Sequence, residues 1–353
     1  MAIFDEAQYL KNPADQSYKA AQALEARQRL CLTGTPVENN LDELWAIFAV
    51  CLPSLFGDRT GFRRNFRTPI EKHGNVERQR VLARRLRPFL LRRTKEEVAA
   101  DLPAKTEILE TVEPDGGQRD LYETIRLAMD KRVREEIARK GLGRSRITIL
   151  DALVKLRQVC CDPRLVKLET ARRRTAAGIS SAKLARLLEM VPDLLTDGRR
   201  ILLFSQFTSM LDLIKPELER CGIAYVELTG ATRDRETPVR RFQAGEVPLF
   251  LISLKAGGTG LNLTAADTVI HYDPWWNPAV EDQAADRAHR IGQDKPVFVY
   301  KLVTAGTVEE RMLELQERKR RLGEAIYDHE GAEADTLSVE DVAFLLAPAG
   351  GDG

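Results

Sequence analysis

Short β-rich runs alternate with longer helical stretches through the C-terminal half of the chain. The runs that predict strands lie at residues 201–204, 225–228, 249–253, 268–272 and 297–303. The stretches that predict helices lie near residues 209–220, 233–243 and 279–290. Strands and helices that alternate in this way build βαβ units, so we expect an α/β fold with three layers and a mainly parallel sheet over residues 180–322. In such sheets functional residues gather on loops at the carboxyl ends of the strands.

Residues 1–54 show part of the same pattern. A strand ends at Asp5, an Ala- and Leu-rich helix follows, and a second strand begins at Arg29. These two strands cannot form a complete lobe, because a parallel sheet needs both of its faces covered. We therefore predict a partial α/β lobe here, with exposed apolar surface and poor solubility.

The segment between these two lobes is mainly helical and strongly basic. Apart from residues 106–112 it lacks the alternation of a strand, so we assign residues 55–179 to a helical insertion and inter-lobe region. Residues 59–95 contain thirteen Lys and Arg residues and two glutamates, a balance of +11 in a chain of net charge +1. A solvated helical face and a polyanion partner are both possible interpretations of such a run. Residues 323–353 form an acidic tail with a short predicted helix.

The composition argues against a membrane or secreted protein. Among 353 residues with 43% hydrophobic content, no apolar run approaches the roughly 20 residues of a membrane span. The first residues lack the basic and apolar regions of a signal peptide. The five cysteines show no metal-ligand spacing. We expect a cytoplasmic protein with reduced thiols and no membrane partner.

The sequence lacks the loop with which many nucleotide-driven motors hold phosphates. That loop combines glycines with a final Lys-Ser or Lys-Thr pair, and no such G-x-x-x-x-G-K-[ST] pattern occurs in the 353 residues. The nearest stretch is Ala-Gly-Gly-Thr-Gly at residues 256–260, which has the glycines without the lysine. By itself this stretch is typical of a strand-to-helix turn.

Asp5 and Glu6 stand at the end of the first strand, in the order that ATP-driven motors use. In that arrangement the aspartate holds Mg²⁺ through water and the glutamate positions the attacking water. Gln8 follows, and then Leu-Thr-Gly-Thr-Pro-Val-Glu-Asn-Asn at residues 32–40. In these residues the chain resembles the Swi/Snf family of helicase-like ATPases, which are translocases on double-stranded DNA within helicase superfamily two.

The resemblance continues in the family's order almost to the C-terminus. The matching segments are residues 89–95, 102–107, 156–163, 201–207, 254–263, 273–278 and 283–293. It implies two RecA-like lobes, of which residues 180–322 form the second and residues 1–54 the end of the first. It also implies that ATP and Mg²⁺ bind between the lobes, with Asp5 and Glu6 in catalytic positions and Asp5 holding the metal through water.

Gln283, Arg287 and Arg290 have the spacing of residues on one side of a helix. Surface arginines paired with Asp282 or Asp286 would show the same spacing. The resemblance implies instead that Arg287 and Arg290 are catalytic arginine fingers. Such fingers stabilise charge on the γ-phosphoryl group and are worth about 10³ to 10⁵ in rate in comparable enzymes. Hydrolysis would then depend on closure of the lobes.

The resemblance assigns the remaining site residues to two groups. The residues expected to contact ATP are Gln8, Gly258 and Gln283. The residues expected to contact DNA phosphates, or to couple DNA to the nucleotide, are Thr33, Gly34, Thr35, Ser205, Gln206, Thr229, Gly230, Lys255, Gly257, Thr259, Gly260 and Asn262. A solvated side chain is the open alternative for Lys255. We expect Trp275 and Trp276 to pack in the core, and His289 to orient its neighbours by hydrogen bonding.

The missing phosphate loop leaves two functions open. In the first, the chain is the C-terminal portion of an ATP-dependent translocase on duplex DNA, truncated at its N-terminus and inactive until a segment with the phosphate loop completes it in cis or in trans. In the second, it is a non-catalytic DNA-binding module or subunit. Nucleoprotein complexes are expected partners, and the nucleoid is the expected location. The segments TGTP, DPWWNP and RAHRIGQ argue against an RNA helicase.

Overall fold

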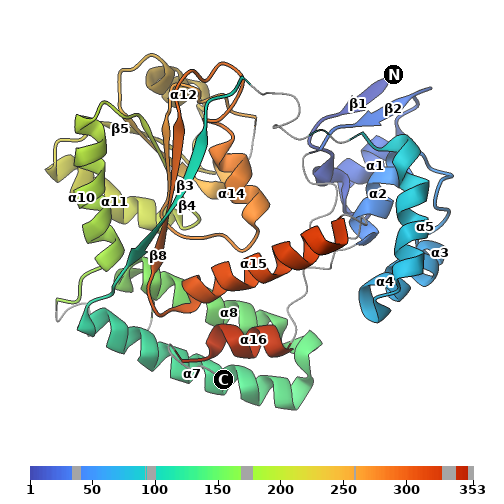
Figure 1. The fold of residues 1–353 in the computed structure, drawn as a ribbon, viewed down its shortest axis with the longest axis horizontal. Coiled ribbons are helices and arrows are strands. Elements are labelled where there is room, and N and C mark those ends of the chain that lie inside the picture. Colours follow the sequence, from blue (N-terminus) through green and yellow to red (C-terminus); the bar gives the residue numbers. More distant parts are fainter. Residues whose placement is uncertain are drawn as a thin grey trace. The chain divides into compact units, whose positions relative to one another are not determined.

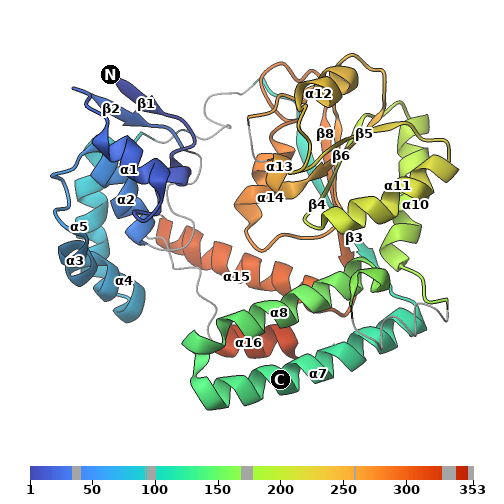
Figure 2. The ribbon, with the colours of Figure 1, turned by 180° about the vertical axis from the view of Figure 1, so that it is seen from behind.

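The computed structural model describes residues 1–33, 41–91, 93, 101–167, 178–257, 260–327 and 339–348. The chain folds as two compact units (Figure 1, Figure 2). Unit 1 comprises Met1–Thr94 and Glu317–Ser338, and unit 2 comprises Lys95–Gln316 and Val339–Gly353. The domain limits that we placed at residues 54, 179 and 322 stay predictions.

Unit 1 begins with two short strands that pair in parallel, β1 (Ala2–Phe4) and β2 (Arg29–Cys31). The 3₁₀ helix η1 (Ala7–Leu10) and the helix α1 (Gln16–Ala23) connect them. The two strands and the intervening helix that the sequence predicted are therefore confirmed. Because the strands are parallel, the segments after Phe4 and Cys31 leave the sheet at the same edge.

The two-stranded sheet exposes apolar side chains. Ile3 and Leu30 are partners in the strand register, and they keep 54% and 47% of their surface exposed. Leu32, just beyond β2, is 44% exposed. Apolar surface left in water forgoes about 25 cal/mol of stabilisation per Å². The exposed apolar surface predicted for residues 1–54 is confirmed by these side chains, and the poor solubility and the partial lobe stay predictions.

A helical layer follows the strands in unit 1. Its elements are α2 (Leu41–Cys51), α3 (Arg59–Phe62), the π-helix η2 (Arg63–Arg67), α4 (Thr68–His73), α5 (Val76–Leu86) and the 3₁₀ helix η3 (Arg87–Phe89). Phe56 meets Phe48 and Phe62 edge to face, with ring centroids 5.7 and 5.3 Å apart. Each such contact adds about 0.5–1.5 kcal/mol beyond the buried area, so these rings help to form the core of the layer.

A buried carboxylate holds three arginines of the basic segment. Asp42 on α2 is 4% exposed. Its Oδ2 atom accepts hydrogen bonds from Arg59, Arg63 and Arg67 at 3.0, 2.7 and 2.7 Å. In an α-helix residues four apart drift around the axis by about 40°, and the wider turn of the π-helix η2 offsets this drift. These three arginines therefore serve the fold of unit 1.

Unit 2 contains a six-stranded parallel sheet. Its strands, in spatial order, are β3 (Lys105–Val112), β8 (Val297–Thr304), β7 (Thr268–His271), β4 (Ile201–Ser205), β6 (Leu249–Ser253) and β5 (Tyr225–Leu228). Five of them confirm the strands predicted in the C-terminal half. The edge strand β3 is the strand-like stretch that the sequence analysis placed in the inter-lobe region, and it pairs with β8 along its whole length.

Helices cover both faces of this sheet (Figure 1). They are α10 (Ala182–Thr196), α11 (Thr208–Arg220), α12 (Glu236–Gln243), α13 (Leu254–Gly257) and α14 (Pro278–Ala285). Leu203 of β4 packs in one hydrophobic cluster with residues of α10 and α11. Its neighbour Leu202 packs in a second cluster with residues of α12 and α14. Successive residues of a strand face opposite sides, so the predicted three-layer α/β fold is confirmed.

The helical insertion of unit 2 is built on two long helices, α7 (Gly116–Lys140) and α8 (Leu142–Cys161). Figure 2 shows α16 (Val339–Leu346) beside them. Arg126 Nη1 on α7 donates to the carbonyl of Leu346 at 2.8 Å, which joins the two ends of unit 2's sequence. A further helix, α15 (Val308–Tyr327), follows β8. No helix in the described ranges is both long and apolar enough to cross a membrane.

Replacement of Asp42 by asparagine is predicted to lower the free energy of unfolding of unit 1 by about 1.5–3 kcal/mol, because three partly exposed guanidinium groups lose their charge-assisted hydrogen bonds to the carboxylate. Hydrogen exchange of α2 peptides in increasing urea measures the change. The matched control is Asp212→Asn, an exposed aspartate that pairs with Lys215 at 2.7 Å and is worth at most about 1 kcal/mol. Equal effects of the two substitutions would contradict the structural role of Asp42.

The effect of Asp42→Asn is also predicted to depend on pH. Burial raises the pKa of Asp42, but hydrogen bonds from Arg63 and Arg59 and the charge of Arg67 outweigh it and hold the pKa below its ordinary value of 3.8. The carboxylate therefore stabilises unit 1 fully above pH 3.8, and this contribution is lost as the pH falls through the lower pKa of the folded state. The difference between wild type and Asp42→Asn should shrink in that acidic range.

Candidate functional site

Asp5 and Thr33 follow the carboxyl ends of the paired strands β1 and β2. Two side chains link these positions. Gln8 Nε2 donates to Glu6 Oε2 at 2.6 Å, and Thr33 Oγ1 donates to Gln8 Oε1 at 2.7 Å. Asp5 Oδ1 accepts the backbone N–H of Glu6 at 2.9 Å. One hydrogen-bonded chain therefore joins the two carboxylates predicted to be catalytic to Thr33, which is predicted to couple them to DNA.

Glu6 adopts a left-handed backbone conformation, with φ of 49° and ψ of 50°. Among the described residues it is the one non-glycine residue with a positive φ. This conformation costs about 1–2 kcal/mol for a residue with a side chain. The next residue is anchored, because Ala7 N donates to the carbonyl of Leu32 at 2.8 Å. Residues held in strained conformations cluster at active sites, which supports the catalytic position predicted for Glu6.

The Asp5 carboxylate is exposed and suits one kind of metal site. Within the described part of the chain, no group of three or more His, Cys, Asp or Glu side chains could hold a metal ion. Mg²⁺ usually keeps several waters and takes one or two carboxylates together with substrate phosphates. A single exposed aspartate fits such a site, in which the phosphates of ATP supply further ligands.

Predicted DNA-contacting residues of unit 2 lie at the carboxyl edge of its sheet. Ser205 ends β4 and Gln206 follows it, Thr229 and Gly230 follow β5, and Lys255 follows β6. The strands are parallel, so all of these segments leave the sheet at the same edge. Gly230 and Lys255 are exposed there. The fold therefore brings five residues that are distant in sequence to one edge.

The carboxylate of Asp273, just after β7, connects the loops at this edge. Its side chain is completely buried. Oδ1 accepts hydrogen bonds from Ser205 Oγ at 2.6 Å and from Gln206 N at 3.3 Å. The loop after β4 is thereby fixed to the loop after β7. The sequence analysis included Asp273 in a matching segment without giving it a role, although an acid at the end of a buried strand was a usable signal.

Arg157 on α8 completes the same cluster and was also missed. It is 6% exposed, and its Nη2 atom donates to the carbonyl of Pro274 at 2.6 Å and lies 3.8 Å from Asp273 Oδ2. Its guanidinium lies 5.6 Å from a ring centroid of Trp275 and 5.9 Å from that of Phe207. A guanidinium can hydrogen-bond in its plane while its faces contact aromatic rings. The helical insertion therefore supports both loops.

The predicted helix over residues 279–290 is wrong at its C-terminal end. The helix α14 ends at Ala285, and residues 286–290 form turns. The carbonyl of Arg287 accepts the N–H of Leu263 at 3.0 Å, in place of the N–H four residues later that a continuing helix would supply. Gln283, Arg287 and Arg290 consequently do not share one helical face.

Side chains around the turn at residues 286–290 fix its shape. Gln293 Nε2 donates to the carbonyls of Ala266 and Ala288 at 2.7 and 3.1 Å. His289 Nε2 forms a hydrogen bond with the carbonyl of Pro103 at 2.8 Å, in line with the orienting role expected for it. Arg290 is exposed at the end of this braced turn. The sequence analysis gave Gln293 no role of its own.

Asp282 is one of the two acids that could have paired with these arginines, and the structure places it beside a lysine. Its Oδ1 atom lies 3.4 Å from Lys105 Nζ on β3. Gln283 and Arg287 are half-buried, whereas Arg290 is exposed. The nucleotide-contacting roles of Gln283, Arg287 and Arg290 stay predictions.

The glycine-rich turn after β6 has a packing requirement. A Cβ atom at Gly257 would lie 2.8 Å from Phe204 Cε1, so only glycine fits there without a shift. Gly260 and Asn262 are exposed, and the carbonyl of Asn262 accepts Gln243 Nε2 at 3.1 Å. The DNA-contacting roles of Gly257, Gly260 and Asn262 stay predictions. Four predicted site residues lie outside the described residues: Gly34, Thr35, Gly258 and Thr259.

Glu281 on α14 holds the loop that carries the two tryptophans. Its Oε1 atom accepts the backbone N–H of Trp275 at 2.5 Å, and Oε2 lies 3.5 Å from Lys301 Nζ. Burial raises the pKa of Glu281 to about 7, although the charge of Lys301 opposes the shift. Gln316 Nε2 donates to the carbonyls of Trp275 and Trp276, and Trp275 packs against the hydrophobic core as expected.

Glu281 is predicted to make unit 2 less stable as the pH rises from about 4.5 to 7. In this range the folded state keeps a proton that the unfolded chain releases, because the folded pKa is about 7 and the ordinary value is 4.5. The expected loss is about 3 kcal/mol. It appears as the difference between the urea unfolding curves of wild type and Glu281→Gln, which keeps the acceptor for Trp275. Parallel pH profiles of the two proteins would contradict this assignment.

The comparisons with known proteins all point to one protein family. A model described as the SNF2-related domain matches residues 1–165, and a model described as the helicase conserved C-terminal domain matches residues 182–292. YwqA of Bacillus subtilis, named as an ATP-dependent helicase/translocase, is 40% identical over 352 residues, which are 98% of this chain and 38% of that protein. The human SWI/SNF-related matrix-associated actin-dependent regulator of chromatin subfamily A member 1 is 37% identical over 330 residues, 91% of this chain and 31% of that protein.

Solved structures agree with the sequence matches. The Sulfolobus solfataricus SWI2/SNF2 ATPase core in complex with dsDNA is 34% identical, with a TM-score of 0.54 over 98% of this chain and 72% of that chain. The C-terminal part of the Fun30 ATPase domain, at 21% identity and a TM-score of 0.50, shows a similar fold. The chain thus spans about two fifths or less of the curated relatives described above. It belongs to the SWI2/SNF2 family of ATP-dependent helicases and translocases.

Proposed function

We propose that this chain forms part of an ATP-dependent translocase on double-stranded DNA, and that another segment supplies the phosphate loop of the motor in cis or in trans. The observation that carries the proposal is the hydrogen-bonded chain from Glu6 through Gln8 to Thr33. Gln8 bonds to Glu6 and to Thr33 at once. A movement of either residue therefore shifts the Gln8 side chain and changes its hydrogen bond to the other residue. Such a chain is suited to couple nucleotide chemistry to movement on DNA.

The nucleotide half of the proposal uses two sets of residues. ATP with Mg²⁺ would supply the phosphoryl group whose hydrolysis releases energy. Asp5 would hold the metal through water, and Glu6 would orient the attacking water. Arg290, exposed on its braced turn in unit 2, would stabilise the charge that develops on the phosphoryl group. Without a phosphate loop these residues have little hold on the nucleotide, so we expect the chain alone to be inactive.

The DNA half of the proposal uses the carboxyl edge of the unit 2 sheet. Gly230 and Lys255 are exposed there, beside loops that Asp273 fixes. Backbone N–H groups and lysines of this kind contact phosphates without regard to sequence. One structural relative is an ATPase core bound to double-stranded DNA. The name of the human relative refers to chromatin, so we infer nucleoprotein complexes as substrates and the nucleoid as the location.

A non-catalytic DNA-binding module is the second candidate. The absence of a G-x-x-x-x-G-K-[ST] pattern from the 353 residues favours it. This candidate shares the DNA contacts of the first and differs from it in ATP hydrolysis after a segment with the phosphate loop has been supplied. Strain stored at Glu6 favours the translocase, because a module without chemistry has no use for a strained acidic residue at the end of β1.

Lys255→Ala is predicted to weaken binding of the chain to duplex DNA and to lower the slope of log K against log salt concentration by about 1, as expected for one lost phosphate contact. Fluorescence anisotropy with a labelled mixed-sequence duplex measures both quantities. The control is Lys215→Ala, whose ammonium group already pairs with Glu227 at 3.2 Å. Unchanged binding in Lys255→Ala would contradict the assigned contact. Binding of duplex RNA as tightly as duplex DNA would contradict the proposed substrate.

A further inference from the structure

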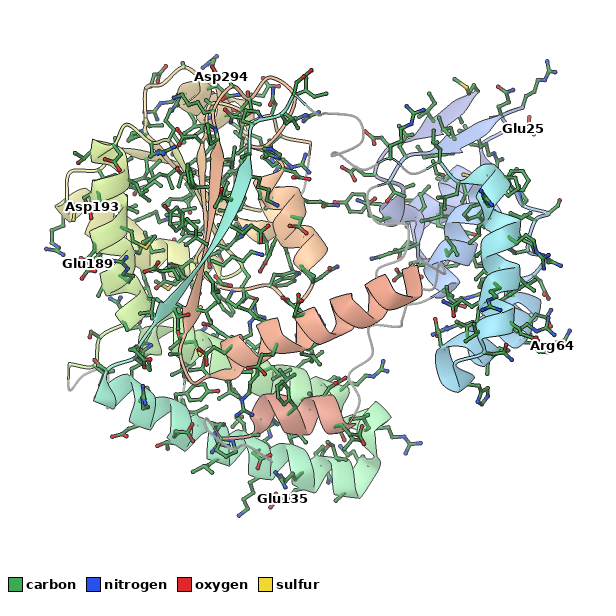
Figure 3. The ribbon with its side chains drawn as sticks, in the orientation of Figure 1. Glu25, Arg64, Glu135, Glu189, Asp193 and Asp294 are labelled. Atoms are coloured by element: carbon green, nitrogen blue, oxygen red, sulfur yellow. The ribbon has the colours of Figure 1, made fainter. Side chains whose placement is uncertain are left out.

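The structure separates the basic segment of unit 1 into two groups of arginines. Arg59, Arg63 and Arg67 are held by the buried Asp42. The second group is exposed and has no acidic partner among the residues that the structure describes; it consists of Arg64, Arg78, Arg80, Arg84 and Arg87. Figure 3 shows the side chain of Arg64 pointing away from the helices of unit 1. Within the described part of the chain no acidic side chain neutralises this second group, so its positive charge can attract an external anion.

Three of the exposed arginines share one face of α5. Arg80, Arg84 and Arg87 have the spacing i, i+4 and i+7, and Arg87 keeps α-helical backbone angles directly after α5. This spacing places them within about 60° around the helix and about 10 Å along it. Leu82 is 4% exposed and anchors the opposite side of α5 in the core. We call the side with Arg80, Arg84 and Arg87 the α5 arginine face.

A single acid lies on α5. Glu77 stands in the first turn, where the positive end of the helix dipole favours a carboxylate. The face therefore keeps a positive balance even with Glu77 counted. A face that only needed solubility would be expected to carry both signs of charge interspersed, with acid-base pairs at i, i+4. The arginines of the second basic helix, α7, do have such pairs, as in Arg134 with Asp130 at 2.9 Å.

The choice of arginine points to phosphate as the anion. Residues 59–95 contain eleven arginines and two lysines. A guanidinium group makes two parallel hydrogen bonds to one phosphate, which an ammonium group cannot do. One strand of duplex DNA carries a phosphate for about every 3.4 Å of its axis. A row of three arginines that spans about 10 Å matches a short run of such phosphates.

We propose that the α5 arginine face binds the phosphate backbone of duplex DNA, in addition to the loops at the carboxyl edge of the unit 2 sheet. The proposal rests on the proposed function in one respect, since duplex DNA is the ligand. It adds a second contact surface, carried by the helices of unit 1. Through this surface the chain holds DNA without regard to base sequence and with a strong dependence on salt.

The test compares two triple variants of the full chain that change the net charge equally. The first is Arg80→Gln, Arg84→Gln and Arg87→Gln on the α5 arginine face. The control is Arg132→Gln, Arg134→Gln and Arg139→Gln on α7, where the arginines are 55%, 72% and 67% exposed and each contacts an acid. Anisotropy with a labelled mixed-sequence duplex, between about 50 and 200 mM salt, gives the slope of log K against log salt.

The variant of the α5 arginine face should bind with a slope smaller by about 2.7, which is about 0.9 for each lost phosphate contact. The α7 variant should change the slope by less than about 1. Replacement of the same three α5 residues by lysine should keep most of the slope, which confirms that the fold is intact. Equal slopes in wild type and the α5 variant would overturn the inference and leave the proposed function standing. Equal decreases in both triple variants would show a general charge effect and would also overturn it. Failure of the wild-type chain to bind duplex DNA would overturn both.

Discussion

The arrangement of the loops at the carboxyl edge of the unit 2 sheet depends on the hydrogen bonds and the ion pair of the buried Asp273 carboxylate. A charge at this depth costs several kcal/mol unless it is paired and hydrogen-bonded. Ser205, Gln206 and Arg157 together meet that requirement. The loop after β4, the loop after β7 and the helix α8 are therefore held in one arrangement.

The constraint extends from Asp273 to the predicted arginine finger. Trp275 follows two residues later, and its backbone N–H is held by Glu281 of α14. The turn that carries Arg290 begins where α14 ends. A displacement of the loop after β4, where DNA is proposed to bind, is thus connected through covalent structure and three hydrogen-bonded side chains to Arg290. This connection gives the proposed coupling of DNA contact to hydrolysis a physical route within unit 2.

Features that depend on neighbouring residues could be predicted from the sequence, whereas features that depend on contacts between distant residues could not. The strands of unit 2 could be predicted because runs such as residues 249–252 are apolar throughout, as buried parallel strands are. The end of α14 could not be predicted, because Leu263 and Gln293 bond to its following turn from outside the helix. The role of Arg157 was equally hidden, since Asp273 and Pro274, which its guanidinium contacts, are more than 100 residues away. Family resemblance located the motifs, but only the fold shows which side chains hold them together.

ATP hydrolysis by the purified chain, with and without duplex DNA and beside an Arg290→Ala variant, tests the central claim most directly. The claim is that the chain supplies the carboxylates, the arginine finger and the DNA contacts of a motor, while its phosphate loop comes from another segment. The account predicts salt-sensitive DNA binding by the chain and no turnover under either condition. Turnover that rises with DNA and disappears in Arg290→Ala would contradict it, because a complete nucleotide site would then exist without that loop.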